Sequence, residues 1–249
     1  PNEYVYWSIQ IVMYPYMTGL VAGAFVLSSL YHVFNVERLK EIARYALVFS
    51  FALLPVAMMP LMLHLMQPFR GIHVLMTPHF TSAISAFGIV FMTYAFIVAA
   101  EIWFVYRKFI VESVHRLNNK QDRSGLESLL LPIYKVISLG AMDISKDALD
   151  SDHKAVKFLA ALGIPVACFL HGYAGFIFGS VKANALWMTP LMPVIFICSA
   201  VVSGIALCIV SYYIFMEMRK WAAKRGKNWL LPDALAQGGT AIPVEQLRS

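Results

Sequence analysis

Histidine, arginine and hydroxyl side chains gather in residues 64–82, a stretch between two long apolar segments. An imidazole titrates near neutral pH, so it can exchange a proton and hydrogen-bond a carbonyl group. An arginine beside it can stabilise developing negative charge. The pattern predicts a proton-capable binding site where the chain turns over at a membrane face. Its candidate residues are His64, Arg70, His73, His79, Thr81 and Ser82.

A second polar group lies far along the chain, in and after the fourth apolar segment. His171 is about 13 residues into this segment, roughly 20 Å from its inner end at 1.5 Å per residue. Tyr173 lies in the same segment, and Lys182 and Trp187 follow in the next connector. An ionisable residue inside a membrane span is costly and marks a functional site. We therefore expect two distant connectors to supply polar groups to one membrane level.

A quinone is the kind of ligand that these side chains suit. Its carbonyl groups accept hydrogen bonds, its reduction consumes two protons, and its apolar tail favours access from the lipid. We expect His64, His73 and His171 to provide hydrogen bonds and protons. The expected quinone-binding residues are Arg70, His79, Thr81, Ser82, Tyr173, Lys182 and Trp187. A structural or interface role remains the alternative for each histidine, and Arg70 and Lys182 can serve as interface anchors.

Two residues of the third apolar segment form a candidate proton path. Glu101 lies roughly 27 Å from the outer end of that segment, too deep to touch the outer cluster. It is near the inner boundary, where it could link the inner side to the site. Tyr94 supplies a phenol near mid-span. A snorkelling or paired carboxylate and a packing phenol are the alternatives.

The composition indicates an integral membrane protein. Hydrophobic residues make up 59% of the chain and charged residues only 14%, whereas a soluble domain is about a quarter charged. The net charge of +6 is spread around apolar segments and forms no continuous basic stripe, which argues against nucleic-acid binding. The cysteines Cys168, Cys198 and Cys208 lie inside apolar segments without a CxxC pair, so no metal site is expected.

Five apolar segments are long enough to cross a hydrocarbon layer of about 30 Å. Helix is the state that satisfies their backbone groups in lipid, so we expect an all-α, polytopic transmembrane helix bundle over residues 1–216. The predicted spans are 9–30, 45–65, 83–105, 158–179 and 191–215. The inner loop 107–157 is predicted to carry an interfacial helix at 129–142. Residues 217–249 are predicted to form a basic irregular tail.

The lysines and arginines predict an orientation. If the N-terminus is outside, eighteen of the 20 lie in inner segments and only Arg70 and Lys182 lie outside. Positive residues favour the cytoplasmic side. We therefore expect a multi-pass protein with its N-terminus outside and its C-terminus inside.

Several motifs resemble those of the NrfD/PsrC family, the polysulfide-reductase-type membrane subunits of respiratory complexes. Residues 7–31, which contain the run at 14–25, resemble the first span of the family, and 64–70 and 77–82 resemble its LDLGRP and RPNxTS segments. The run LHGYAGFIFG at 170–179, with KANALWMTP at 182–190, is similar to the family's LHSYTGxLLG and ARPLWxTP. The motifs cover nearly all of residues 1–216 and look closest to the menaquinone reductase subgroup.

The resemblance implies a subunit of a respiratory oxidoreductase complex in a bacterial or archaeal inner membrane. Such a subunit holds no metal and binds menaquinone or ubiquinone near the outer face. There it exchanges electrons with an iron–sulfur, ferredoxin-like partner, alongside other subunits of the complex. The resemblance places the site around 64–73, Thr81, Ser82 and His171. His64 replaces the start of an Asp-containing connector and His79 replaces an Asn, so the resemblance leaves open which residue handles protons.

Two other classes of protein remain possible from the sequence. One is a di-haem b-type cytochrome anchor with His64 and His171 as axial ligands, although the inner level offers no second histidine pair. The other is a non-redox transporter or anchor subunit whose broken helices line a solute cavity.

Overall fold

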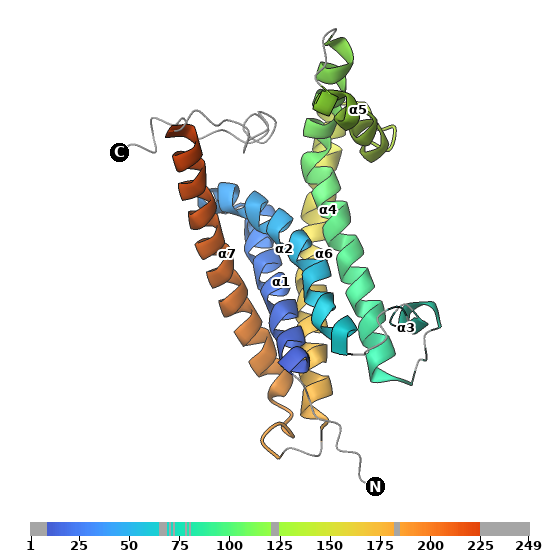
Figure 1. Cartoon of the computed structure of the whole chain (residues 1–249), viewed down its shortest axis with the longest axis vertical. Helices are drawn as coiled ribbons and strands as arrows, with labels where there is room; N and C mark the ends of the chain where they lie inside the picture. Colours follow the sequence, from blue (N-terminus) through green and yellow to red (C-terminus); the bar gives the residue numbers. More distant parts are fainter. Residues whose placement is uncertain are drawn as a thin grey trace. The chain divides into compact units, whose positions relative to one another are not determined.

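The computed structural model describes residues 9–64, 69, 71, 73–77, 79, 81–120, 125–181 and 185–224. The regular elements in these residues are all helical: α1 (Ile9–Phe34), η1 (Glu37–Leu39), α2 (Lys40–His64), α3 (His73–Met76), α4 (Ala83–Asn119), α5 (Gly125–Ile137), α6 (Lys146–Gly179) and α7 (Met192–Lys224) (Figure 1). Five helices in this part of the chain are long and apolar enough to cross a membrane. The predicted all-α transmembrane class is thus confirmed.

The chain divides into two compact units, which are described separately. Unit 1 comprises Pro1–Ala100 and Phe158–Tyr212, and unit 2 comprises Glu101–Lys157 and Tyr213–Ser249. Unit 1 therefore holds α1, η1, α2, α3, the first part of α4, most of α6 and the first part of α7. Unit 2 holds the second half of α4, all of α5, the beginning of α6 and the end of α7.

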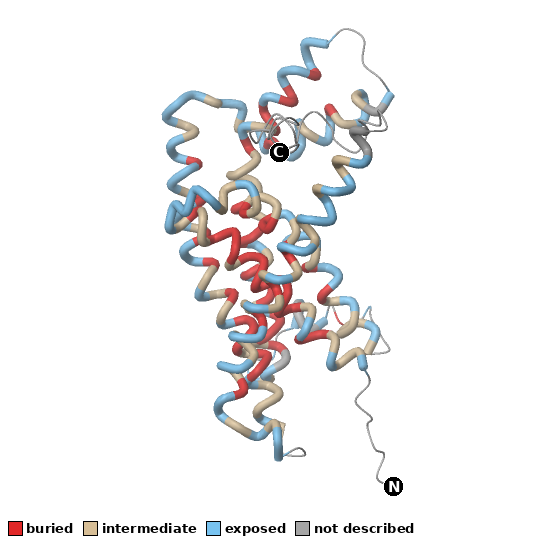
Figure 2. The backbone as a smooth tube through the Cα atoms, turned by 90° about the vertical axis from the view of Figure 1, so that its left-hand side faces the viewer, coloured by how far each residue is buried: buried red, intermediate tan, exposed pale blue. Residues whose placement is uncertain are grey.

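Helix α1 is the most buried span of unit 1. In its most apolar window 67% of the residues are buried, compared with 17% for α7. Ring contacts join α1 to α4, with centroid distances of 5.4 Å for Tyr14–Phe87 and for Phe25–Tyr94. The interior of the bundle is drawn in red in Figure 2. Helix α2 buries one face, because its small and apolar residues recur at helical spacing: Ala43, Ala46, Leu47, Ser50, Leu54 and Ala57.

Glycines bring the backbones of α1 and α7 into contact. A Cβ atom on Gly23 would overlap the Ala200 carbonyl oxygen and lie 2.7 Å from the Cα atom of Gly204. A Cβ atom on Gly204 would lie 2.7 Å from the Leu20 carbonyl oxygen. Lipid supplies no hydrophobic force between helices, so close packing of small residues is a main source of their association. These two glycines therefore fix where α1 and α7 cross.

Several helices extend beyond their predicted spans. Helix α4 continues to Asn119 and α6 begins at Lys146, so much of the predicted inner loop continues the spans. In unit 2, Leu131 of α5 packs on Val114 and Leu117 of α4. This apolar face explains why α4 stays helical past its predicted end. That α5 lies in a membrane interface stays a prediction.

The final helix also runs further than expected. Helix α7 includes residues 217–224, which were predicted to belong to an irregular tail. Lys220 Nζ lies 2.8 Å from Glu217 Oε1, one helical turn earlier, and such a pair stabilises a helix. The rest of the predicted tail, 225–249, lies outside the described residues.

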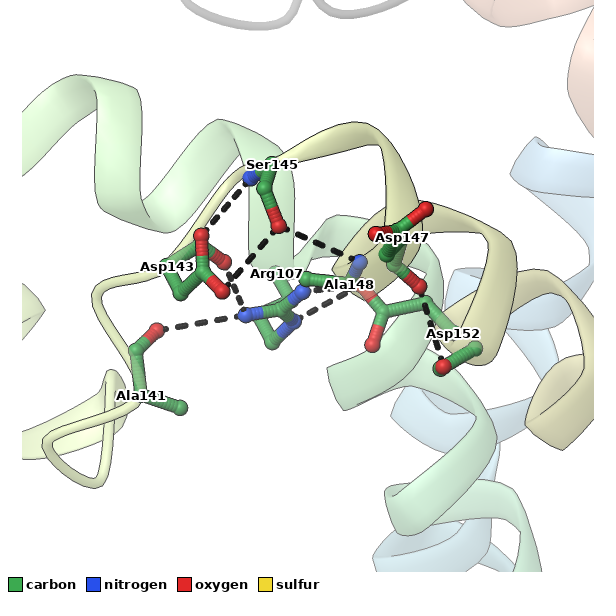
Figure 3. A network of polar contacts seen from close by, with 8 residues as sticks. Arg107, Ala141, Asp143, Ser145, Asp147, Ala148 and Asp152 are labelled. Atoms are coloured by element: carbon green, nitrogen blue, oxygen red, sulfur yellow. Dashed lines mark hydrogen bonds and ion pairs between the residues drawn. The ribbon is translucent and has the colours of Figure 1, made fainter.

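A buried ion pair joins α4 to α6 within unit 2 (Figure 3). Arg107 is 4% exposed and Asp152 9%. The Arg107 guanidinium donates from Nε to Asp152 Oδ2 at 2.7 Å, and its Nη2 lies 2.6 Å from the same oxygen. Its Nη1 donates to the Asp143 carbonyl oxygen at 2.7 Å. One side chain of α4 thus holds both α6 and the loop before it.

The same loop caps the start of α6. The Ser145 backbone N–H donates to Asp143 Oδ1 at 2.8 Å, and the Ser145 hydroxyl donates to Oδ2 at 3.1 Å. Both bonds lower the pKa of the Asp143 carboxyl from its usual value, and the backbone bond has the larger effect. Because they favour the ionised carboxylate, the stability they add is present above the usual pKa of the carboxyl. It is lost as pH falls through the lowered value.

Replacement of Arg107 with leucine should strongly destabilise the protein. Asp152 would be left buried without its cation, which costs about 3–5 kcal/mol. The matched control is Lys108→Leu, because the Lys108 side chain is 56% exposed and lies 3.8 Å from Glu112. Its loss should cost under about 1 kcal/mol. The midpoint of thermal unfolding in detergent measures both, and equal decreases would show that the buried pair does not anchor the unit.

Candidate functional site

A cavity of about 290 Å³ opens between α1, α6 and α7 in unit 1. Its lining is largely apolar and aromatic, with polar atoms from a few side chains. The lining residues are Val12, Pro15, Tyr16, His171, Phe178, Trp187, Met192, Ile195, Phe196 and Ser199. The volume is close to the lower limit of ligand pockets, about 300 Å³. The cavity can therefore hold a group the size of a ring system.

His171 forms the buried wall of this cavity. Its side chain comes from α6, it is 4% exposed, and its Nδ1 atom has no hydrogen-bond partner among the described residues. A buried polar atom without a partner costs about 1–3 kcal/mol. A ligand that hydrogen-bonds this nitrogen would remove that cost, which makes His171 the chemically distinctive residue of the cavity.

Gly19 of α1 makes room for the imidazole. A Cβ atom at this position would lie 2.9 Å from Cε1 and 3.0 Å from Nε2 of His171. Real Cβ contacts are essentially never this short, so a side chain here would displace the ring. Gly19 and Gly23 have the spacing of a small-residue helix-packing motif, and Gly19 thus also positions the histidine.

An aromatic row continues from His171 along the cavity. The ring centroids lie 5.5 Å apart for His171 and Phe196, 5.6 Å for Phe196 and Phe178, and 5.8 Å for Phe178 and Trp187. These distances are typical of favourable aromatic pairs. The rings are tilted to one another by 32°, 38° and 64°, so the row offers a polarisable wall of aromatic faces and edges against which a planar ring can pack.

Trp187 reaches this row because the loop after α6 turns closely over the helix end. A Cβ atom on Gly179 would lie 3.1 Å from the Thr189 carbonyl oxygen, so a larger residue would push the loop away. Thr189 also orders the turn before α7, since its Oγ1 accepts a hydrogen bond from the Leu191 N–H at 3.3 Å and its carbonyl oxygen accepts one from the Met192 N–H at 3.2 Å. Gly179 and Thr189 therefore hold Trp187 over the cavity.

The first connector meets the bundle at the same end as the cavity. This end of unit 1 is here termed the connector end (Figure 1). It contains the start of α1, the end of α2, the start of α4, the end of α6 and the start of α7. His64 is the last residue of α2 and His73 begins α3. His171 lies about 12 Å along α6 from Gly179. Neither His64 nor His73 lines the cavity.

Three predicted quinone-binding residues organise the start of α4. Thr81 Oγ1 lies 2.8 Å from His79 Nδ1, and the Ser82 N–H donates to the His79 carbonyl oxygen at 2.9 Å. The His79 N–H donates to Ser85 Oγ at 3.0 Å. These residues hold the chain in its turn into α4, and none of them lines the cavity.

The other candidates are placed apart from His171. Tyr173 lies between the exposed rings of Phe169 and Phe176, at 5.7 Å and 5.8 Å, and does not line the cavity. It is two residues from His171, which places it on a different face of the helix. Arg70 and Lys182 lie outside the described residues.

The two residues of the candidate proton path are both fully buried. The Tyr94 hydroxyl lies 3.3 Å from Ser50 Oγ and donates to the Val21 carbonyl oxygen at 3.4 Å. It therefore joins α4, α2 and α1 through polar contacts inside unit 1. Glu101 belongs to unit 2.

Sequence reasoning missed two hydroxyl residues of the cavity, Tyr16 and Ser199. Tyr16 lies in the family-like run 14–25, and Ser199 belongs to a group of small residues on α7 that also contains Ala200, Ser203 and Gly204. Their spacing gave no sign of a shared site, because α1 and α7 are apolar around most of their circumference. Only the pairing of these helices brings the two hydroxyl residues to one cavity.

The fold and the cavity define a polytopic membrane protein with a small pocket at one end of its bundle. The chain belongs to the NrfD family: the family described as "Polysulphide reductase, NrfD" matches residues 1–228. The family resemblance drawn from the sequence motifs is thus confirmed.

Curated relatives are similar over most of this chain. It is 33% identical to a selenate reductase subunit of Mesobacillus selenatarsenatis, over 88% of this chain and 50% of the relative. It is 28% identical to a putative dimethyl sulfoxide reductase membrane subunit of Halobacterium salinarum, over 89% of this chain and 46% of the relative. It is 25% identical to an Hdr-like menaquinol oxidoreductase integral membrane subunit of Archaeoglobus fulgidus, over 86% of this chain and 43% of the relative. The chain spans about half the length of these relatives.

Replacement of Gly19 with alanine should move the His171 ring. In protein labelled with ¹³C at histidine Cε1, the resonance that disappears in His171→Gln identifies His171 among the 7 histidines. This resonance should shift in Gly19→Ala. It should stay in place in Gly125→Ala, because a Cβ atom on Gly125 has no neighbour within 4 Å. An unchanged resonance in Gly19→Ala would contradict the proposed role of Gly19.

Proposed function

We propose that the chain is the quinone-binding membrane subunit of a respiratory oxidoreductase complex. In this proposal it exchanges electrons between an iron–sulfur partner subunit and the membrane quinone pool. The observation that carries the proposal is the cavity at the connector end, whose largely apolar lining includes His171, a buried histidine with a ring nitrogen that has no protein partner among the described residues.

The residues of the cavity fit a quinone ring. A quinone needs a flat apolar surface for its ring and a hydrogen-bond donor or acceptor for each oxygen. In this proposal one of the mutually tilted rings of Phe196, Phe178 and Trp187 packs against the quinone, and the His171 imidazole hydrogen-bonds one of its oxygens. The lining carries no charged side chain among the described residues, which suits a neutral, lipid-soluble molecule.

Bound quinone supplies two-electron, two-proton redox chemistry. The proposed roles of this chain's residues are to bind the quinone ring and to deliver or remove its protons. His171 orients the ring and holds a proton at its imidazole, while the aromatic row excludes water. His64 ends α2 and His73 begins α3 at the connector end, and we assign them to proton exchange with the outside. The remaining proposed contacts of the ligand, or of its route to the cavity, are Arg70, His79, Thr81, Ser82, Tyr173 and Lys182. Tyr94 and Glu101 form a proposed proton path.

The names of the relatives support a place in a redox complex. They are named as subunits of a selenate reductase, a putative dimethyl sulfoxide reductase and a menaquinol oxidoreductase. We propose that the iron–sulfur partner docks at the connector end, because electrons must arrive close to the cavity. The lysine and arginine distribution supports an outside position for that end in a bacterial or archaeal cytoplasmic membrane.

Quinone binding can be measured through Trp187. In protein that keeps Trp187 and has phenylalanine at the other tryptophans, menaquinone-4 in the bilayer should quench the fluorescence saturably. His171→Leu should weaken binding about tenfold, which corresponds to the loss of one hydrogen bond worth about 1.4 kcal/mol. His171→Gln, which keeps a hydrogen-bonding side chain, should recover part of the affinity.

The matched control is His115→Leu, because His115 is exposed and belongs to unit 2. It should leave quenching unchanged. Absence of saturable quenching in the parent protein, or equal affinity in His171→Leu and His115→Leu, would contradict the proposed function. A haem absorbance band in the purified chain would instead favour the cytochrome alternative.

A further inference from the structure

We infer that the end of α5 and the turn after it form a membrane anchor, in which Val136 and Leu139 insert among lipid chains at the surface that α4 reaches near Trp103. This surface is the one predicted to be the inner one. The anchor belongs to unit 2 and is independent of the proposed quinone site. The sequence alone predicts an interfacial helix at 129–142, and the contacts of unit 2 indicate which of its residues insert and what holds them there.

The edge of the hydrocarbon layer on α4 falls near Trp103. This residue is about 30 Å along α4 from Ala83, which equals the thickness of the layer, and tryptophan favours this boundary. Arg107 lies about 6 Å further along α4 and pairs with Asp152 of α6. Asp152 in turn precedes the apolar segment that begins at Phe158 by about 9 Å. Both helices therefore place the ion pair just outside the hydrocarbon edge.

Side chains of α4 hold the end of α5 beside this edge. The Trp103 indole Nε1–H donates to the carbonyl oxygen of Ile137, the last residue of α5, at 2.8 Å. The Arg107 Nη1 donates to the Ala141 carbonyl oxygen at 3.4 Å, so the turn after α5 is held as well. The segment between these two contacts, which contains Leu139, thus lies where the hydrocarbon layer meets the lipid head groups.

The face of α5 that turns away from α4 is apolar. Leu131 packs on α4, beside which α5 lies (Figure 1). Leu129, Ile133 and Val136 recur at intervals of four and three residues and are exposed, Val136 by 73%. Lys135 is exposed next to this stripe, where its ammonium group can reach lipid phosphates. An amphipathic helix of this kind at the membrane boundary buries its apolar face in the lipid.

The backbone of Leu139 points to the same conclusion. Its φ is 51°, in the left-handed region that favours glycine, and Gly140 follows with a φ of 75°. The Leu139 N–H donates to the Val136 carbonyl oxygen at 3.1 Å, so this turn is hydrogen-bonded. The Leu139 side chain is 75% exposed. In water nothing would offset the backbone strain of a large apolar residue here, whereas burial among lipid chains does.

The test measures the depth of spin labels in liposomes of phosphatidylethanolamine and phosphatidylglycerol that contain the full-length protein. Val136→Cys and Leu139→Cys each carry a nitroxide in a background whose 3 native cysteines are alanine. The matched control, Asn119→Cys, is exposed at the far end of α4, about 24 Å beyond Trp103. Relaxation of each label is measured with oxygen, which concentrates in lipid, and with a water-soluble nickel chelate.

The ratio of oxygen to chelate accessibility should be about threefold higher at positions 136 and 139 than at 119, because apolar side chains of an interfacial helix lie below the head groups. Equal ratios at the three positions would place the apolar face in water and overturn the anchor. Labels at 136 and 139 that neither reagent reaches would show that protein covers this face, which overturns it as well.

A second measurement uses the native sequence and so does not depend on the folding of a cysteine-free variant. A phosphatidylglycerol with a diazirine near the start of one acyl chain is activated in the same liposomes, and modified peptides are identified by mass spectrometry. Cross-links within 133–142 are expected. Cross-links to the membrane spans, with none within 133–142, would overturn the anchor.

Discussion

The candidate site depends on one backbone contact inside the bundle. Gly23 of α1 and Gly204 of α7 approach so closely that no side chain fits at either position. In lipid such contacts hold helices together by van der Waals packing and weak Cα–H···O bonds, because burial of apolar surface gains little there. The cavity lies on the connector side of this contact. A larger residue at either glycine would separate α1 from α7 and remove two walls of the cavity.

The same use of small residues explains how a polar ring is kept in an apolar interior. Gly19 leaves space for His171, and Gly179 lets the loop with Trp187 close over the end of α6. The imidazole is therefore held by shape, and its buried Nδ1 atom has no hydrogen-bond partner among the described residues. Unit 2 shows the contrasting solution, since Arg107 is buried with its charge paired to Asp152. Unit 2 thus pairs its buried charge within the protein, whereas unit 1 leaves the His171 Nδ1 atom without a protein partner among the described residues.

The sequence was sufficient for the fold class, the five spans and the family, because segregated charge and long apolar segments are direct signals of membrane helices. It also singled out His171 and Trp187, which the structure brings to one cavity. It could not show Tyr16 and Ser199 as neighbours, because a helix that is apolar on all sides does not reveal which face meets which helix. It also missed the helical continuation of α4 beyond Val105, since the apolar residues that hold it pack on α5, a helix that follows in the chain.

Photo-crosslinking most directly tests whether the quinone binds between α1, α6 and α7. An azido-menaquinone would be activated in membranes that contain the assembled protein, and the modified peptides identified by mass spectrometry. The account predicts cross-links within residues 12–19 of α1 and 192–199 of α7, reduced by an excess of unlabelled menaquinone. Cross-links confined to the connector at 64–82, with none in α1 or α7, would contradict it.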